Sequence, residues 1–169
     1  KVEQFGVVPV IKIEDANDAV PLAKALCEGG LPCAEVTFRT EAAEAAIQAM
    51  REAYPDMLLI AGTVLTKEQA DRAVSAGAQA VVSPGFNRKV VDYCVRKGIL
   101  ILPGCSCPSD MEQAIEAGAV CGEIFPGRGK RGNQGDPGDG GALRAASVYA
   151  YRRRKRCKYA GVFKKRQSP

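Results

Sequence analysis

Glycine recurs at a nearly fixed interval through the middle of this chain, each time just after a segment with helical periodicity. The three glycines are 21 and 20 residues apart: Gly77, Gly98 and Gly118. A Pro-Gly pair likewise follows three short apolar runs, at 84–85, 103–104 and 126–127. Glycine after a helix supplies the left-handed residue that closes it. Repeating units of one strand and one helix, each about 20 residues long, therefore restrict the fold to a parallel α/β architecture.

The strands of these units are near-continuous apolar runs, which is typical of strands buried on both faces. We expect strands over 6–13, 33–38, 57–61, 80–83 and 99–102, and a sixth that ends at Phe125. We expect helices over 15–28, 41–53, 66–76, 89–97 and 110–117, with Thr66 and Gly77 capping the third. Serial strand–helix units predict a (β/α)8 TIM-barrel fold, incomplete here because two more units would be needed. An open doubly wound sheet is the runner-up, but no Gly-x-Gly-x-x-Gly turn marks one.

The character of the chain changes at about Cys121. Residues 1–121 hold 11 Lys+Arg against 16 Asp+Glu, whereas 122–169 hold 13 against 3. After Pro126 the strand–helix rhythm stops, and 127–141 is rich in Gly, Arg, Asp and Asn. We therefore expect two parts, a partial (β/α) barrel over 1–126 and a basic, Gly/Arg-rich tail over 127–169. The tail is too polar to complete a core and is expected to be disordered.

Missing residue types exclude several kinds of chemistry. The chain has no histidine, which excludes Ser-His-Asp and Cys-His catalysis and the usual zinc sites. Seven cysteines include no Cys-x-x-Cys pair, and Cys105-x-Cys107 lacks partner ligands, so we expect no metal. There is no apolar run of membrane-spanning length and no signal-peptide core at the N-terminus. We therefore expect a cytoplasmic protein with reduced thiols and no membrane partner.

The second expected strand carries the most informative residues. Side chains alternate between the faces of a strand, so Glu35, Thr37 and Arg39 should share one face, opposite an apolar face. A Glu and an Arg inside a barrel are costly unless they pair or bind something. One interpretation is a structural salt bridge. The other is a carboxylate acid/base beside a guanidinium that clamps a substrate carboxylate or phosphate, at the strand end where barrel active sites are built.

The third expected strand leads into Gly62 and Thr63 at the same mouth of the barrel. Gly62 would let backbone come close to a ligand, and Thr63 offers a hydroxyl and an N–H. A plain strand-to-helix turn fits the spacing equally well. The loops at 83–85 and 103–104 are expected to contribute shape only.

Four segments stand in a specific order and spacing: Glu35-Val36-Thr37-Phe38-Arg39-Thr40, Ala61-Gly62-Thr63-Val64-Leu65, Ser83-Pro84-Gly85 and Leu102-Pro103-Gly104. With them the chain resembles the class I aldolases of the 2-keto-3-deoxy-6-phosphogluconate / 4-hydroxy-2-oxoglutarate family, over about 1–126. The resemblance implies a homotrimer of (β/α)8 barrels in cytoplasmic carbohydrate metabolism, of the Entner-Doudoroff type. It implies an enzyme that needs no cofactor and cleaves a small 2-keto acid to pyruvate and an aldehyde, either glyceraldehyde 3-phosphate or glyoxylate.

The same resemblance implies roles for individual residues. Glu35 would be the general acid/base, and Arg39 and Thr63, beside Gly62, would bind the pyruvate carboxylate. The mechanism also needs a lysine amine, which attacks the keto carbonyl and forms an imine that accepts electrons during C–C cleavage. In the family this lysine begins a Lys-Phe-Phe-Pro motif, but the matching stretch here begins with Glu123. A glutamate cannot form an imine, so we expect the chain as it stands to be inactive.

The departure from the family after Cys121 has the form of a reading-frame change. A shift of one nucleotide, with a free choice of synonymous codons, converts 121–128 to Val-Val-Lys-Phe-Phe-Pro-Gly-Glu. The same shift converts 150–155 to Pro-Thr-Gly-Gly-Val-Asn, which is the family's later strand motif. Two family motifs at the family's spacing make coincidence a poor explanation. We therefore interpret the residues from about Cys121 as the aldolase gene read one nucleotide out of frame.

Two other functions fit parts of the sequence. One is a non-catalytic, aldolase-like fragment whose basic run at 152–156 binds nucleic acid. No aromatic stacking pattern accompanies that run, so no nucleic-acid partner is expected. The other is a different barrel enzyme, such as a phosphate-binding isomerase, that uses Glu35 alone. The segment at 127–132 does not end as a P-loop does and is not interpreted as one.

Overall fold

The computed structural model describes residues 5–119 and 123–124 of the chain. Its strands are β1 (Val10–Ile11), β2 (Cys33–Thr37), β3 (Leu58–Gly62), β4 (Ala80–Ser83), β5 (Ile101–Cys105) and β6 (Glu123–Ile124). Its helices are the 3₁₀ turn η1 (Ala16–Asp18) and α2 (Ala19–Glu28), α3 (Ala42–Ala53), α4 (Lys67–Ser75), α5 (Arg88–Lys97) and α6 (Pro108–Glu116). Strands and helices alternate, as the glycine rhythm predicts.

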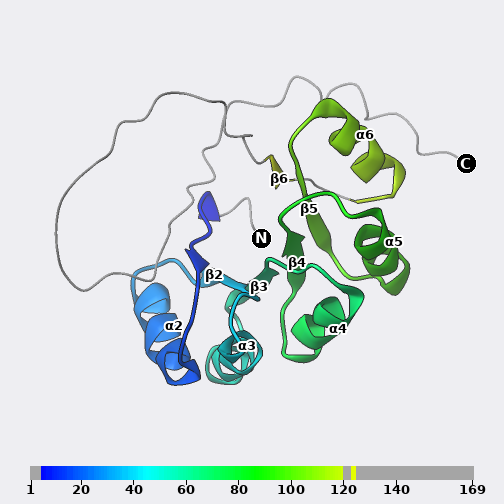
Figure 1. Ribbon diagram of the computed structural model, residues 1–169. Helices are drawn as coiled ribbons and strands as arrows, with labels where there is room; N and C mark the ends of the chain where they lie inside the picture. The colour runs from blue at the N-terminus through cyan, green and yellow to red at the C-terminus, as the bar shows by residue number, and fades with distance from the viewer. Residues whose placement is uncertain (1–4, 120–122, 125–169) are drawn as a thin grey trace, which may run out of the picture.

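The strands form one parallel sheet in the order β1-β2-β3-β4-β5-β6, so neighbours in sequence are neighbours in space. Figure 1 shows helices α2 to α6 as an outer arc that follows the strands. A doubly wound sheet would reverse its strand order and carry helices on both faces. The serial order therefore favours the predicted barrel, with β1 and β6 at the two ends of the described sheet.

The core has two layers. The larger one lies between strands and helices, where Val36, Leu59 and Val81 pack in one cluster with Ile47 and Met50 of α3. The smaller one, the inner apolar cluster, lies on the opposite face of the strands, and its buried part consists of Cys33, Leu58, Ile60, Ala80 and Val82. It therefore marks the face that would line the barrel interior. Both faces of β3 and β4 are buried, which explains their apolar sequences.

The repeated glycines follow the ends of their helices, as their spacing predicts. Gly77, Gly98 and Gly118 all have positive φ, at 103°, 69° and 82°. Such a conformation is open to glycine at little steric cost, so each residue lets the chain leave its helix and turn toward the next strand. The Thr66 side chain accepts a hydrogen bond from the Gln69 amide, which confirms the predicted N-cap. The C-terminal cap of α4 is Ala76, one residue earlier than predicted.

Several boundaries differ from the prediction for local reasons. The strand predicted over 6–13 is reduced to Val10–Ile11, just after Pro9, which has no N–H for a sheet bond. The helix predicted from residue 15 begins as a 3₁₀ turn that the Asp15 side chain caps. The strand predicted from residue 99 begins at Ile101, because the Ile99 amide donates to the Cys94 carbonyl at the end of α5.

The basic tail predicted over 127–169 lies outside the described residues. Among the helices that the structure does describe, none has the length and apolar character needed to cross a membrane.

Candidate active site

Glu35 lies on the concave face of the sheet, which is the face that carries the inner apolar cluster. It is near the C-terminal ends of β2 and β3. The parallel register pairs Glu35 with Ile60 and Thr37 with Gly62. Paired residues project to the same face, so Glu35 lies on the side of Ile60, which belongs to the inner apolar cluster. The Glu35 side chain is half-buried. The sequence prediction that Glu35 faces the inside of the sheet is thus consistent with the register.

The Glu35 side chain reaches along its strand as far as Gly62. A Cβ placed on Gly62 would lie 2.0 Å from Oε1 of Glu35 and 2.8 Å from its Cδ and Cγ. The space that glycine leaves is therefore filled by this carboxylate. The sequence predicts that this space admits a ligand near the backbone, and the structure instead shows a side chain of the chain itself there.

Arg39 does not share the strand face of Glu35, contrary to the prediction. Strand β2 ends at Thr37, and Arg39 lies in the turn that follows, with an exposed side chain. The Arg39 amide donates to the Thr37 carbonyl across this turn at 2.8 Å. The alternation of faces holds only while the backbone is extended, so it cannot be carried across the turn. The faces of β2 therefore do not determine the side on which Arg39 lies.

The turn brings Arg39 to Thr63 instead. Nε of Arg39 donates to Oγ1 of Thr63 at 3.2 Å. A guanidinium carries five N–H donors, so this bond leaves capacity to bind a carboxylate. Thr63 has φ of 58°, a conformation that is rare for a β-branched residue. Strained backbone conformations of this kind are common at ligand-binding positions, where contacts with the surrounding structure maintain them.

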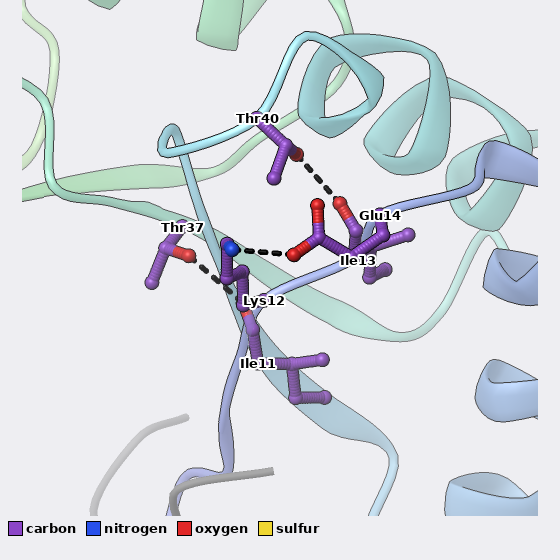
Figure 2. Close-up of polar contacts among 6 residues, drawn as sticks. All are labelled: Ile11, Lys12, Ile13, Glu14, Thr37 and Thr40. Atoms are coloured by element: carbon purple, nitrogen blue, oxygen red, sulfur yellow. Dashed lines mark hydrogen bonds and ion pairs between the residues drawn. The ribbon is translucent and has the colours of Figure 1, made fainter. Parts of the chain in front are cut away.

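Two threonines join β1 to β2 at the same end of the sheet. Oγ1 of Thr37 donates to the Ile11 carbonyl at 3.1 Å, and Oγ1 of Thr40 donates to the Ile13 carbonyl at 2.5 Å. Figure 2 shows both bonds, together with the ion pair between Lys12 and Glu14. The hydroxyls satisfy carbonyls just at and beyond the end of the short strand β1. Sequence reasoning placed Thr37 beside Glu35 but missed this role, because the partner is a backbone atom distant in sequence.

The other thiols and hydroxyls near this face are engaged within the fold. Sγ of Cys33 donates to the Val7 carbonyl at 3.5 Å, and burial raises the pKa of this thiol. A raised thiol pKa keeps the sulfur protonated at neutral pH and makes it a poor nucleophile. Oγ of Ser83 donates to the Gly85 carbonyl at 2.9 Å, which fixes the turn after β4.

Glu123 is the one predicted site residue for which the structure describes only the backbone. Strand β6 pairs with β5 in parallel, with Glu123 in register with Gly104. Gly104 lies two residues beyond Leu102, which packs on the inner cluster. By register, position 123 therefore belongs to the concave face of the same sheet that carries Glu35.

The comparisons with known proteins agree on one family. The sequence signature described as "Aldolase: KDPG and KHG aldolase" matches residues 1–133. The 2-dehydro-3-deoxy-phosphogluconate aldolase of Treponema pallidum is 52% identical over 124 residues, which are 73% of this chain and 59% of that protein. The enzyme of the same name from Haemophilus influenzae is 44% identical over 132 residues, 78% of this chain and 62% of that protein.

A solved structure agrees with these relatives. KDPG aldolase from Legionella pneumophila, with pyruvate captured at low pH as a covalent carbinolamine intermediate, superimposes with a TM-score of 0.69 at 37% identity. The match covers 72% of this chain and 59% of that one. The chain therefore spans about three fifths of the length of the relatives that it matches.

Proposed function

This chain belongs to the KDPG and KHG aldolase family, and we propose that its described part is the acid/base and carboxylate-binding half of a class I aldolase site. The observation that carries the proposal is the Glu35 carboxylate, held against Gly62 beside the Arg39–Thr63 pair. The proposed reaction is cleavage of 2-keto-3-deoxy-6-phosphogluconate to pyruvate and glyceraldehyde 3-phosphate, or of 4-hydroxy-2-oxoglutarate to pyruvate and glyoxylate.

The arrangement suits the chemistry of a retro-aldol cleavage. Arg39 and Thr63 hold the carboxylate at C1, which orients the keto carbon at C2 toward the amine of a lysine. Once the imine has formed, Glu35 removes the proton of the C4 hydroxyl. The C3–C4 bond then breaks, its electron pair moves to the imine nitrogen, and the aldehyde leaves. Glu35 returns the proton to C3, and water hydrolyses the imine to release pyruvate and the free lysine.

The lysine is the component that this chain lacks. We propose that it belongs at position 123, where β6 pairs with Gly104 and where the shifted reading frame encodes lysine. The covalent carbinolamine in the Legionella enzyme is an amine adduct of the kind that this step requires. The reading-frame change from about Cys121 is part of the proposal, as are the division into 1–126 and 127–169, the homotrimer and the cytoplasmic setting. The chain with its remaining residues read in the shifted frame is called the restored chain below.

Trapping of the imine tests the proposal. The given chain, its Glu123→Lys variant and the restored chain are incubated with pyruvate and sodium borohydride, and the adduct is located by mass spectrometry. We expect no adduct on the given chain. We expect one reduced pyruvyl group on the restored chain, at the lysine that replaces Glu123, together with cleavage of the 2-keto acid. Glu123→Lys alone tests whether the amine suffices for trapping without the rest of the restored sequence.

Two results would contradict the proposal. One is an adduct on another lysine of the given chain, such as Lys12, because the site would then not need position 123. The other is a restored chain that folds but neither traps pyruvate nor cleaves either 2-keto acid. DNA sequence across codons 118–124 tests the frame change separately, and an undisturbed gene in the given frame would rule it out. Salt-sensitive DNA binding that is lost when 150–157 are deleted would instead support the nucleic-acid-binding alternative.

A further inference from the structure

The Glu35 side chain occupies the space that a side chain at position 62 would need. We propose that Gly62 is a positioning residue, which acts by leaving room for the Glu35 carboxylate and so directs it toward the Arg39–Thr63 pair. This inference rests on the proposed function for its kinetic consequences. Its structural part stands on the geometry of β2 and β3.

The register shows how far Glu35 must reach. The Cα of Glu35 is level with Ile60, whereas Gly62 is level with Thr37, two residues nearer the mouth. The carboxylate oxygen nevertheless lies closest to the position that a Cβ of Gly62 would occupy. The side chain therefore leans along its strand, toward the C-terminal end where Thr63 follows Gly62. Strand side chains commonly lean in this direction.

Backbone conformation does not explain a glycine at position 62. Gly62 is absent from the glycines with positive φ in the described chain, which include Gly77 and Gly98. It lies in an ordinary strand, and its carbonyl accepts from the Phe38 amide at 2.7 Å. Glycine inside a strand weakens the strand, and it often marks a close approach of another group. The Glu35 side chain is the group that approaches here.

The kind of atom that approaches decides what a methyl group at position 62 would do. The three atoms nearest to that Cβ position all belong to the flexible side chain of Glu35. The side chain can swing aside by rotation about its own bonds, so the fold should tolerate alanine. The carboxylate cannot stay where it is, however. A substitution at Gly62 should therefore spare stability and displace the acid/base group.

Kinetics of Gly62→Ala in the restored chain test this separation. We expect kcat to fall on the order of 100-fold, because a displacement of about 1 Å is enough to cost that much. KM should change by less than about 3-fold, because the carboxylate-binding pair is untouched. The loss should not add to that of Glu35→Gln, since both variants disable one group. Gly85→Ala is the matched control, because nothing lies within 4 Å of a Cβ there.

Stability measurements keep the inference testable if Gly62→Ala folds poorly. In that case Glu35→Ala in the same chain should restore the unfolding midpoint, because it removes the crowded side chain. Failure of that rescue, or a Gly62→Ala variant whose kcat stays within about 3-fold of the parent, would overturn the inference. If the unsubstituted restored chain neither traps pyruvate nor cleaves substrate, the proposed function fails instead. The rescue between positions 35 and 62 would still test the contact itself.

Discussion

Thr63 combines two constraints at a single residue. Its φ of 58° is costly for a β-branched side chain, yet its hydroxyl accepts the Nε–H of Arg39 at 3.2 Å. Because this conformation is costly, its presence indicates that the position needs either the threonine hydroxyl or the backbone N–H that this conformation exposes. The two contributions can be separated by substitution.

Thr63→Ser keeps the hydroxyl and removes the β-branch, whereas Thr63→Val keeps the branch and removes the hydroxyl. In the restored chain we expect Thr63→Ser to retain KM and Thr63→Val to raise it about 10-fold, the equivalent of one lost hydrogen bond to a charged group. Steady-state kinetics with the 2-keto acid measure both values. A Thr63→Val variant with the parent's KM would show that the hydroxyl is not used.

At the scale of elements, one arginine joins parts of two strand–helix units at the end of the sheet opposite the site. Nε and Nη2 of Arg51, in α3, donate to the Gly77 carbonyl at 3.1 and 3.0 Å, and Nη1 donates to the Pro55 carbonyl at 2.5 Å. Gly77 could not carry a side chain here, because a Cβ would lie 2.7 Å from Cγ of Arg51. The end of α3 and the turn after α4 are therefore held together.

Arg51→Lys tests this junction while keeping the charge. A lysine has no planar fork with which to reach both carbonyls, so we expect the free energy of unfolding to fall by about 1–3 kcal/mol. Urea unfolding of the restored chain gives this value, and Arg96→Lys, at an exposed position on α5, is the control. Equal stability of the two variants would mean that the bonds contribute nothing.

The start of helix α6 depends on an ionised carboxylate. Oδ2 of Asp110 accepts from both the amide and the hydroxyl of Ser106 at 2.9 Å, and these bonds lower the pKa of Asp110. A lowered folded-state pKa means that the stabilisation is present above the ordinary aspartate pKa of about 3.9 and is lost as pH falls below it.

Asp110→Asn should therefore destabilise the restored chain near neutral pH, and the difference should shrink as the pH is lowered toward about 3. Unfolding midpoints of the parent and the variant, measured across that pH range, check this expectation. A difference that is independent of pH would assign the effect to geometry and not to charge.

At the scale of the whole molecule, the described sheet ends in two short strands. Among the residues that the structure describes, β1 and β6 each pair with one neighbour, so they are the two edges of the described sheet, and an uncovered strand edge can pair with another chain. We expect the 169-residue chain, expressed as it stands, to aggregate, and the restored chain to be soluble. Light scattering and thermal melting distinguish the two, and a cooperatively melting soluble monomer of the given chain would contradict the expectation.

Much of the fold could be predicted because its signals are local. Gly77, Gly98 and Gly118 close their helices, and Thr66 caps the helix after it, through interactions within a few residues. Apolar runs identify strands buried on both faces. The ends of β1 and β5 could not be placed, because they depend on Pro9 and on the bond that Ile99 gives to the preceding helix.

The sequence by itself determined a serial α/β chain, the motif around Glu35 and Arg39, and the absence of a lysine at position 123. Only the tertiary structure decided how the site residues meet. It ended β2 at Thr37, so that Arg39 turns to Thr63, and it set the Glu35 carboxylate against Gly62. The physical reason is that strand alternation and helix caps are rules of near neighbours. The space beside Gly62 is set by the register of two strands that an entire helix separates in sequence.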